Sequence, residues 1–410
     1  MKCRHCKNEL KHVFVDLYTC PPSNAMVNAE ELNAPENYFP LKIFTCDKCL
    51  LVQVDELKKA DEIFDSEYTY FSSFSTSWLE HSKKYVDTMV DRFHFSSSSQ
   101  IIEIASNDGY LLQYFKEKNI PVLGVDPTAN TAAVAKEKGI ETIVDFFGSS
   151  FAQKELVDNG IMGDLILGNN VLAHVPDIND FVGGMKKALK STGIITMEFP
   201  HLYQLIKEHQ FDTIYHEHFS YLSFHVVKRI FESQGLEMFD VEEIPTHGGS
   251  LRIFAKHRED KTKIISPNVT NLLEKEKKAG MLTMDYYNNF QAIVENIKYN
   301  VWDFLITMKK QNKKVIGYGA AAKGNTLLNY CGVKGNDLIN FVCDASPYKQ
   351  EKFLPGSRIP VMHPDEIKKY KPDFVIIFPW NLKLEISNQL HFIREWGGQF
   401  VVFIPEKQIF

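Results

Sequence analysis

The sequence predicts an α/β protein in which two Rossmann-like domains follow a small zinc-binding domain. Two pairs of cysteines near the N-terminus predict the zinc site, and two later stretches alternate apolar strands with amphipathic helices, as doubly wound sheets do. At 410 residues the chain exceeds what one hydrophobic core usually supports, so at least two large domains are expected. We expect the domains to span residues 1–65, 66–255 and 256–410.

Composition narrows the classes of function. The chain is 44% hydrophobic and 24% charged, and its net charge of −6 provides no field that would collect nucleic acid. The opening residues lack the apolar core of a signal peptide, and no run of about 18 uncharged apolar residues predicts a membrane span. We therefore expect a cytoplasmic protein without a nucleic acid or membrane partner, whose cysteines are thiols or metal ligands.

Four of the seven cysteines form two C-x-x-C knuckles, Cys3-Cys6 and Cys46-Cys49. Each knuckle places two sulfurs on one side of an ion, and zinc prefers a tetrahedron of such ligands. Four unrelated buried or redox cysteines are the alternative. Because four protein ligands leave no open coordination position, the predicted zinc ion is structural.

The middle of the chain predicts a cofactor-binding βαβ unit. The stretch SQIIEIASNDGYLL reads as a strand, a turn that contains Asn107 and Gly109, and a helix, and the next strand ends in Asp126. The closing carboxylate of such a unit accepts hydrogen bonds from both ribose hydroxyls of an adenosine. The strand carries Glu103, and the second glycine that a pyrophosphate requires is missing, so the unit points to a cofactor without phosphates.

Later strands of this domain also end in polar residues. Because carboxyl ends of parallel strands meet at one edge of a sheet, these side chains belong to one site. The set comprises Glu103, Asn107, Asp126, Asp145, Asn170 and His174.

The C-terminal part predicts a second Rossmann-like sheet. KKVIGYGAAAKGN reads as a strand, a turn with Gly317 and Gly319, and a helix that starts near Lys323. Free amides and the helix dipole at such a start favour a phosphate, although the spacing is not that of a Walker loop. A tight turn with an exposed lysine is the alternative. The next strand ends in Asp344.

The segment YHEHFSYLS, which begins at Tyr215, concentrates titratable side chains. From the residue types alone it can be a metal site that uses His216 and His218, a structural cluster, a sugar-binding cluster without chemistry, or an acid–base apparatus. The H-E-x-x-H spacing of zinc enzymes is missing. If the segment is extended, Glu217 faces away from His218.

Four motifs in the same order, EIASNDGYLL, GVDP, NNVLAHVPD and YHEHFSYLS, resemble the S-adenosylmethionine-dependent sugar C-methyltransferases of deoxysugar pathways. The resemblance covers nearly the whole chain and implies an N-terminal four-cysteine zinc-binding domain, a class I methyltransferase domain and a C-terminal α/β domain. It implies methyl transfer from S-adenosylmethionine to C3 of a nucleotide-diphosphate-linked 4-keto-6-deoxy sugar, and it makes a monomer reasonable.

The resemblance also implies roles for single residues. His218 is similar to the catalytic base, with Tyr215 and Glu217 beside it, while His216 has no assigned role. His174 resembles a second active-site histidine, and Tyr70, or Tyr68 by a two-residue shift, should reach the site. Half-buried packing is the alternative for these tyrosines. The residues of THGGSLRIF themselves, His247 and two glycines, predict a tight turn near the site rather than a third base. The expected cofactor residues are Ser75, Glu103, Asn107, Gly109, Asp126, Pro127, Asp145 and Asn170, and the expected substrate residues are Gly317, Gly319, Lys323 and Asp344.

The implied reaction explains why a histidine is needed. A proton at C3 becomes removable only because the neighbouring C4 carbonyl takes the charge as an enolate. A histidine suits the role of base at neutral pH, and a donor near the C4 oxygen stabilises the enolate. One rival hypothesis is a zinc-containing protein without catalytic activity that binds a nucleotide sugar or has a regulatory role. The other is an enzyme that transfers the methyl group to oxygen or nitrogen.

Overall fold

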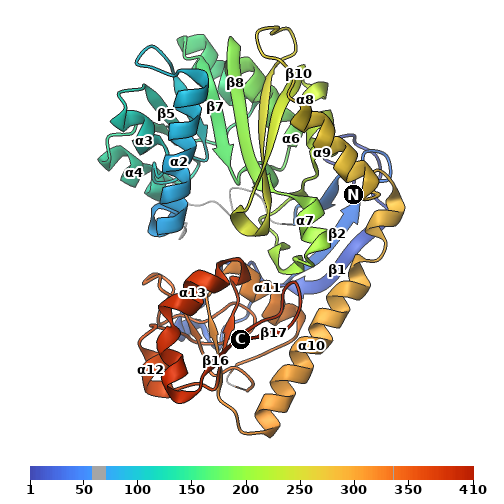
Figure 1. The fold of residues 1–410 in the computed structure, drawn as a ribbon, viewed down its shortest axis with the longest axis vertical. Helices are drawn as coiled ribbons and strands as arrows, with labels where there is room; N and C mark the ends of the chain where they lie inside the picture. The colour runs from blue at the N-terminus through green and yellow to red at the C-terminus, as the bar shows by residue number, and fades with distance from the viewer. Residues whose placement is uncertain (58–70, 336) are drawn as a thin grey trace.

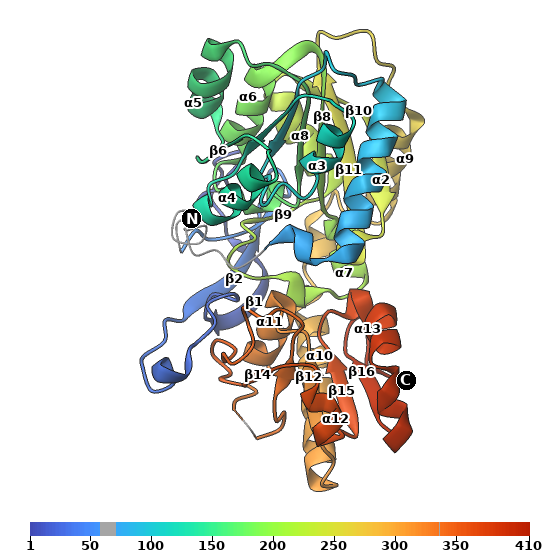
Figure 2. The same cartoon turned by 90° about the vertical axis from the view of Figure 1, so that its left-hand side faces the viewer.

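The structure is a computed structural model that describes residues 1–57, 71–335 and 337–410. Its described residues form one four-stranded, one seven-stranded and one six-stranded sheet. Figure 1 and Figure 2 show the seven-stranded and six-stranded sheets in two domains stacked along the long axis, with the N-terminal sheet beside their junction. Among the described residues, no helix has the length and apolarity that a membrane span requires.

The N-terminal sheet is antiparallel and has the order β1-β2-β3-β9. Its strands are β1 (His12–Cys20), β2 (Phe39–Thr45), β3 (Val52–Val54) and β9 (Ser220–Tyr221). Strand β9 comes from the middle of the chain, directly after the histidine-rich segment, and its Tyr221 pairs with Val52. The small domain therefore anchors one end of that segment.

The central sheet has the order β10-β11-β8-β7-β4-β5-β6. The predicted parallel alternation of strands and helices extends through β8, whereas β11 runs antiparallel to both of its neighbours. All four residues of β4 are buried, as the apolar run predicts for a central strand. The strands are β4 (Ile101–Ile104), β5 (Val122–Val125), β6 (Thr142–Ile143), β7 (Gly163–Asn169), β8 (Leu189–Pro200), β10 (Leu236–Ile244) and β11 (Ser250–His257).

Helices cover the central sheet. Helix α2 precedes the first strand; Ser75 accepts a hydrogen bond from the Trp78 amide at its start, and Tyr85 and Met89 are buried on its inner face. The helices of this domain are α2 (Thr76–Phe93), α3 (Leu112–Glu117), α4 (Ala129–Glu137), α5 (Ser149–Phe151), α6 (Ile178–Ala188), α7 (Leu202–Lys207) and α8 (Phe224–Ser233).

The C-terminal sheet has the order β14-β13-β12-β15-β16-β17, and only its last strand is antiparallel. The long helix α10 connects the two large domains along one side (Figure 1) and buries residues at helical spacing, among them Phe290, Val294 and Val301. The remaining helices and strands of the chain are α9 (Pro267–Lys278), which packs against β10 and α8, α10 (Phe290–Lys310), β12 (Val315–Tyr318), α11 (Ala322–Tyr330), β13 (Val342–Cys343), β14 (Val361–Met362), α12 (Glu366–Tyr370), β15 (Phe374–Ile377), α13 (Lys383–Gln389), β16 (Gln399–Val402) and β17 (Gln408–Ile409).

Buried polar contacts fix how the domains meet. Thr326 of α11 donates to the Ile214 carbonyl at 2.9 Å, and Asn325 donates to the Ser23 carbonyl at 3.2 Å. Residues that follow β4, β5 and β7 line the same cavity as residues that follow β12. The carboxyl edges of both Rossmann-like sheets thus face one another, which is where open α/β sheets bind ligands.

Candidate active site and metal centre

The four predicted cysteines form a compact cluster, here called the thiol cluster. Their sulfurs lie within 4.8 Å of one another, and Cys3 is 3.5 Å from Cys49 while Cys6 is 3.5 Å from Cys46. A zinc–sulfur bond of about 2.3 Å gives sulfur separations of about 3.8 Å in a tetrahedron, so the donor set fits zinc. Among the described residues this is the only such group of potential metal ligands, which argues against a metal at His216 and His218.

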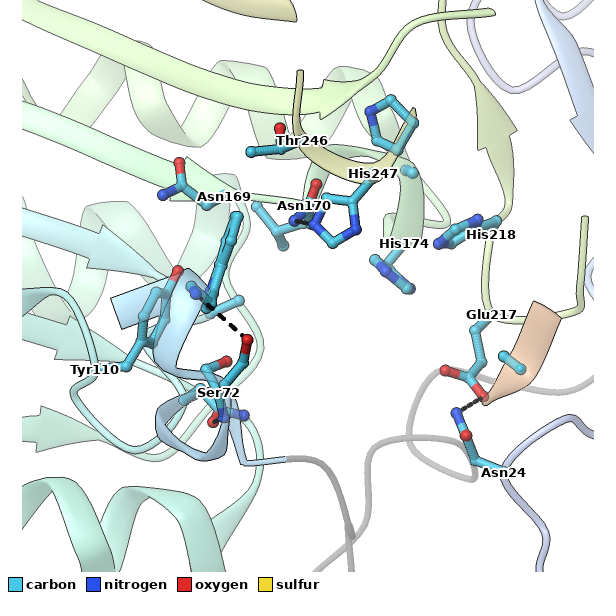
Figure 3. A pocket seen from close by; sticks show the side chains of 18 of the residues that line it. Asn24, Ser72, Tyr110, Asn169, Asn170, His174, Glu217, His218, Thr246 and His247 are labelled. Atoms are coloured by element: carbon cyan, nitrogen blue, oxygen red, sulfur yellow. Dashed lines mark hydrogen bonds between the residues drawn. The ribbon is translucent and has the colours of Figure 1, made fainter. Parts of the chain in front are cut away.

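A cavity of about 680 Å³ lies between the two large domains. Figure 3 shows Ser72 and Tyr110 on one side of it and His218, Glu217 and Asn24 on the other. The predicted residues that line it are Ser75, Asn107, Asp126, Pro127, Asp145, Asn170, His174, Tyr215, Glu217, His218 and Lys323. The predicted residues that do not are Glu103, Gly109, Gly317, Gly319 and Asp344. Tyr68 and Tyr70 lie outside the described residues.

Asp126 follows β5 and lines the side of the cavity where the sequence predicts the cofactor. Its carboxylate accepts from the Asn107 amide at 2.8 Å and from the Thr128 amide at 2.9 Å. Burial raises its pKa, while these hydrogen bonds oppose the rise. The backbone amides hold the carboxylate still at the wall of the cavity, which is the arrangement expected of a ribose acceptor.

Glu103 and Gly109 support this wall from behind. Glu103 is fully buried, and burial, with smaller contributions from Asp126 and Asp108, raises its pKa well above the ordinary value. Gly109 has φ +75°, and a Cβ there would lie 2.5 Å from the Ile140 side chain. Glu103 lies in β4 and Gly109 in the turn that follows it, and neither is among the residues that line the cavity.

His218 has one ring nitrogen committed to the backbone. Its Nδ1 lies 3.0 Å from the Thr213 carbonyl, which can only accept, so Nδ1 carries the proton and Nε2 carries none in the neutral ring. Burial lowers its pKa well below the ordinary value, and His174, His247 and Lys323 add to this effect. At pH 7 His218 is a neutral base.

A tight turn rather than an extended strand carries the cluster. The His218 amide donates to the Tyr215 carbonyl at 3.0 Å, and this turn brings the Tyr215 and His218 rings to 4.1 Å between centroids. Glu217 and His218 consequently both line the cavity, unlike alternating residues of a strand. Glu217 accepts from Asn24 at 2.7 Å.

His174 and His216 have different surroundings. His174 lies edge-on to His218 at 4.7 Å between ring centroids, and burial lowers its pKa to about 4. His216 is buried; its Nε2 lies 3.2 Å from the Pro40 carbonyl, and its ring contacts Phe39. His216 thus packs the turn against strand β2 of the small domain.

Lys323 enters the cavity at the start of α11. Its ammonium donates to Asn381 at 2.7 Å and lies over the Trp380 ring at 4.4 Å. Burial lowers its pKa to about 8, although the carboxylate of Asp212 acts in the opposite direction. Below pH 8 the lysine is a half-buried cation at a helix N-terminus, which suits an anionic ligand.

The other predicted substrate residues stabilise the turn beside Lys323. Gly319 has φ +91°, and a Cβ there would lie 2.4 Å from Pro379. Asp344 accepts from the Ala320 amide at 2.7 Å and from the Ser346 amide at 2.8 Å. These contacts hold the start of α11 in place.

Sequence reasoning missed a polar wall behind the cofactor side. Trp78 and His81 of α2 line the cavity with their rings 4.9 Å apart and nearly parallel. His81 contacts the buried Glu198 at 2.8 Å, and Arg252 donates to the same carboxylate at 2.7 Å. Although burial opposes it, these two partners hold the pKa of Glu198 below its ordinary value. The three-residue spacing of Trp78 and His81 is the signal that they share a helix face.

Comparison with known proteins matches every part of the chain to methyltransferases. Family models match as a zinc binding domain over residues 3–64, a methyltransferase domain over 78–241 and a C-methyltransferase C-terminal domain over 245–405. The chain is 34% identical to the C-methyltransferase NovU of Streptomyces niveus over 408 residues, which cover all of this chain and 96% of NovU.

More distant matches cover a smaller part of the chain. A ubiquinone biosynthesis O-methyltransferase of Bartonella quintana is 29% identical over 23% of this chain and 39% of its own length. Magnesium protoporphyrin IX methyltransferase of Synechocystis, solved with bound S-adenosylhomocysteine, is 12% identical with a TM-score of 0.35, and the match covers 43% of this chain and 82% of that one.

The fold and the site thus define a methyltransferase that depends on S-adenosylmethionine, with an added zinc-binding domain. Within that class the chain belongs to the C-methyltransferase family that includes NovU. Its cofactors are S-adenosylmethionine and zinc. Members of this family are enzymes that methylate carbon. Membership therefore argues against both rival hypotheses, a non-catalytic binding protein and methyl transfer to oxygen or nitrogen.

Proposed function

We propose that this enzyme, a cytoplasmic monomer, methylates C3 of a nucleotide-diphosphate-linked 4-keto-6-deoxy sugar through an enolate, in the biosynthesis of branched deoxysugars. The observation that carries the proposal is the state of His218. A carbon acceptor needs a base that is unprotonated at neutral pH, and His218 offers an Nε2 without a proton in a half-buried, neutral ring.

The cofactor side has the groups that S-adenosylmethionine requires. Asp126 would accept from the ribose hydroxyls, Asp145 is an exposed acceptor on the wall, and Ser75 at the start of α2 would contact the methionine part. When bound, S-adenosylmethionine supplies an electrophilic methyl group. Four thiolates of the thiol cluster would hold the zinc ion, which would then have a structural role only.

Lys323 fits the diphosphate of the substrate. It is the lysine at the start of α11, its ammonium is held by Asn381, and the first amides of a nine-residue helix lie beside it. The sugar would then extend from Lys323 toward His218, because both residues line the same cavity. Tyr215 and His174, which contact the His218 ring, would orient the base.

The proposal is tested with a matched pair of substrates. The purified enzyme is incubated with S-adenosylmethionine that carries a ¹³C-methyl group and with 4-keto-6-deoxy sugar nucleotides of several bases. The corresponding 4-hydroxy sugars are the control, because they cannot form the enolate. We expect a new C3-methyl signal in the product NMR spectrum with a keto sugar only. Transfer to none of the keto sugars, or equal transfer to the hydroxy sugars, would contradict the proposal.

A further inference from the structure

His247 lies on the cavity wall with a fixed hydrogen-bonding pattern. Its Nε2 lies 2.8 Å from Nδ2 of Asn170. An amide nitrogen donates, so Nε2 accepts and the neutral imidazole carries its proton on Nδ1. Burial, together with Lys323, lowers the pKa of His247 to about 4, so the ring is neutral at pH 7. Figure 3 shows this ring pointing into the cavity between Asn170 and His174.

His218 has the complementary pattern. Its Nδ1–H donates to the Thr213 carbonyl, which leaves Nε2 as an acceptor. The two neutral rings therefore offer one acceptor and one donor to the same cavity. Removing a proton next to a carbonyl requires such a pair, because one group takes the proton while the other stabilises the oxygen on which charge develops.

We propose that His247 is a catalytic residue whose Nδ1–H donates a hydrogen bond to the C4 oxygen of the substrate while His218 removes the C3 proton. This role rests on the proposed function. The C3–H bond breaks and its proton goes to Nε2 of His218. The electron pair of that bond forms the C3=C4 double bond, and the C4–O π pair moves to the oxygen. His247 keeps its own proton throughout.

Other groups in the cavity fit this role less well. The Tyr215 ring lies against the His218 ring, so it stands beside the base rather than opposite to it. The Lys323 ammonium is engaged by Asn381 and by the Trp380 ring. His247 reaches the cavity from a separate loop between β10 and β11. A neutral imidazole is able to polarise a carbonyl without surrendering its proton.

The loop holds His247 in an unusual backbone conformation. His247 has φ 54° and ψ 22°, a left-handed region that few residues with side chains adopt. Gly248 follows with φ +90°, and a Cβ there would lie 2.4 Å from the Trp380 ring. Contact with the C-terminal domain therefore fixes the loop, and with it the direction of the imidazole.

Two substitutions at this position separate the donor from the rest of the side chain. His247→Gln places an amide near the position of Nε2, where it still meets Asn170, and leaves no N–H at the position of Nδ1. His247→Asn places an amide at the position of Nδ1, and asparagine tolerates a left-handed backbone. The readout is exchange of the C3 proton of a 4-keto sugar nucleotide in D₂O with S-adenosylhomocysteine bound, which follows deprotonation without methyl transfer.

We expect exchange to slow by about 100-fold or more in His247→Gln and by less than about 10-fold in His247→Asn. S-adenosylhomocysteine affinity and the unfolding temperature should change little in either variant. Unchanged exchange in His247→Gln, or equal slowing in both variants with weaker cofactor binding, would overturn the role of His247 alone. No exchange by the unchanged enzyme with any 4-keto sugar would overturn the proposed function together with this role.

Discussion

The thiol cluster and the three cavity histidines, His174, His218 and His247, solve different chemical problems. The four thiols have one task and arise from two short knuckles, so their spacing in the sequence defines the site. The histidines come from three separate loops, and hydrogen bonds set the tautomers of two of them: the Thr213 carbonyl makes His218 an acceptor, and the Asn170 amide makes His247 a donor.

The difference shows that a metal ligand can be recognised from the spacing of residues in the sequence, whereas the proton chemistry of a histidine depends on the folded structure. A cysteine in a paired knuckle is a metal ligand almost wherever the knuckles are placed. A histidine becomes a base or a donor only after folding fixes its partner, its burial and its neighbouring charges. Stability should therefore depend on the thiol cluster, and turnover on the histidines.

The largest expected effect is on folding. Cys46→Ser removes one zinc ligand, and the loss of the metal should lower the free energy of unfolding by an amount on the order of 5 kcal/mol. Zinc content and thermal unfolding measure this. Cys331→Ala is the control, because Cys331 is buried outside the thiol cluster and should leave zinc content intact. Full zinc content in Cys46→Ser would contradict the four-thiol site.

The second effect is on turnover. His218→Asn removes the proposed base and should lower kcat by about 1,000-fold, whereas S-adenosylhomocysteine should bind as before. His216→Asn is the matched control two positions away, because His216 contacts Pro40 and Phe39 instead of the cavity. Its kcat should fall by less than about threefold. A similar loss of kcat in both variants would contradict a catalytic role of His218 and indicate that the turn has only a structural role.

The third effect is on substrate binding and its pH dependence. Lys323→Met should raise KM for the sugar nucleotide by about 100-fold, since a charge-assisted contact in the cavity is lost. In the unchanged enzyme Lys323, with its pKa lowered to about 8, is cationic below pH 8 and loses its charge above it. kcat/KM should therefore fall as the pH rises from 7 to 9.

Lys323→Arg sharpens this prediction, because arginine stays charged over the whole range. The falling limb of kcat/KM should move to higher pH in that variant. A limb that stays near pH 8 would show that another group titrates there.

The smallest expected effect concerns the exposed cofactor wall. Asp145→Ala should raise the dissociation constant of S-adenosylhomocysteine by about fivefold, because an exposed hydrogen bond contributes about 1 kcal/mol. Asp158→Ala, on the same domain and outside the cavity lining, is the control. Calorimetric titration measures both constants, and equal values would remove Asp145 from the cofactor site.

The fold was largely predictable because its signals are local. Buried runs such as the one that forms β4 predict strands, and paired knuckles predict the zinc site. Strand β9 could not be predicted, since two residues that join the N-terminal sheet carry no periodicity. The antiparallel β11 was also hidden, because strand direction depends on the connection and not on the strand's own residues.

The site was predictable only in part. Asp126 and Lys323 follow strands, where α/β folds place ligands, and both line the cavity. Trp78 and His81 come from a helix that precedes the sheet, so no strand end marks them. His247 was expected in a tight turn, and its proposed role rests on its contact with Asn170, a residue 77 positions away. Such pairings are tertiary and leave no trace in a single sequence.

The claim that His218 removes the C3 proton is tested most directly by exchange of that proton for deuterium. A 4-keto-6-deoxy sugar nucleotide is incubated in D₂O with S-adenosylhomocysteine and either the unchanged enzyme or His218→Asn, and the C3 proton signal is followed by NMR. We predict loss of the signal with the unchanged enzyme and none above background with His218→Asn. Equal exchange by both proteins would contradict the assignment of His218 as the base.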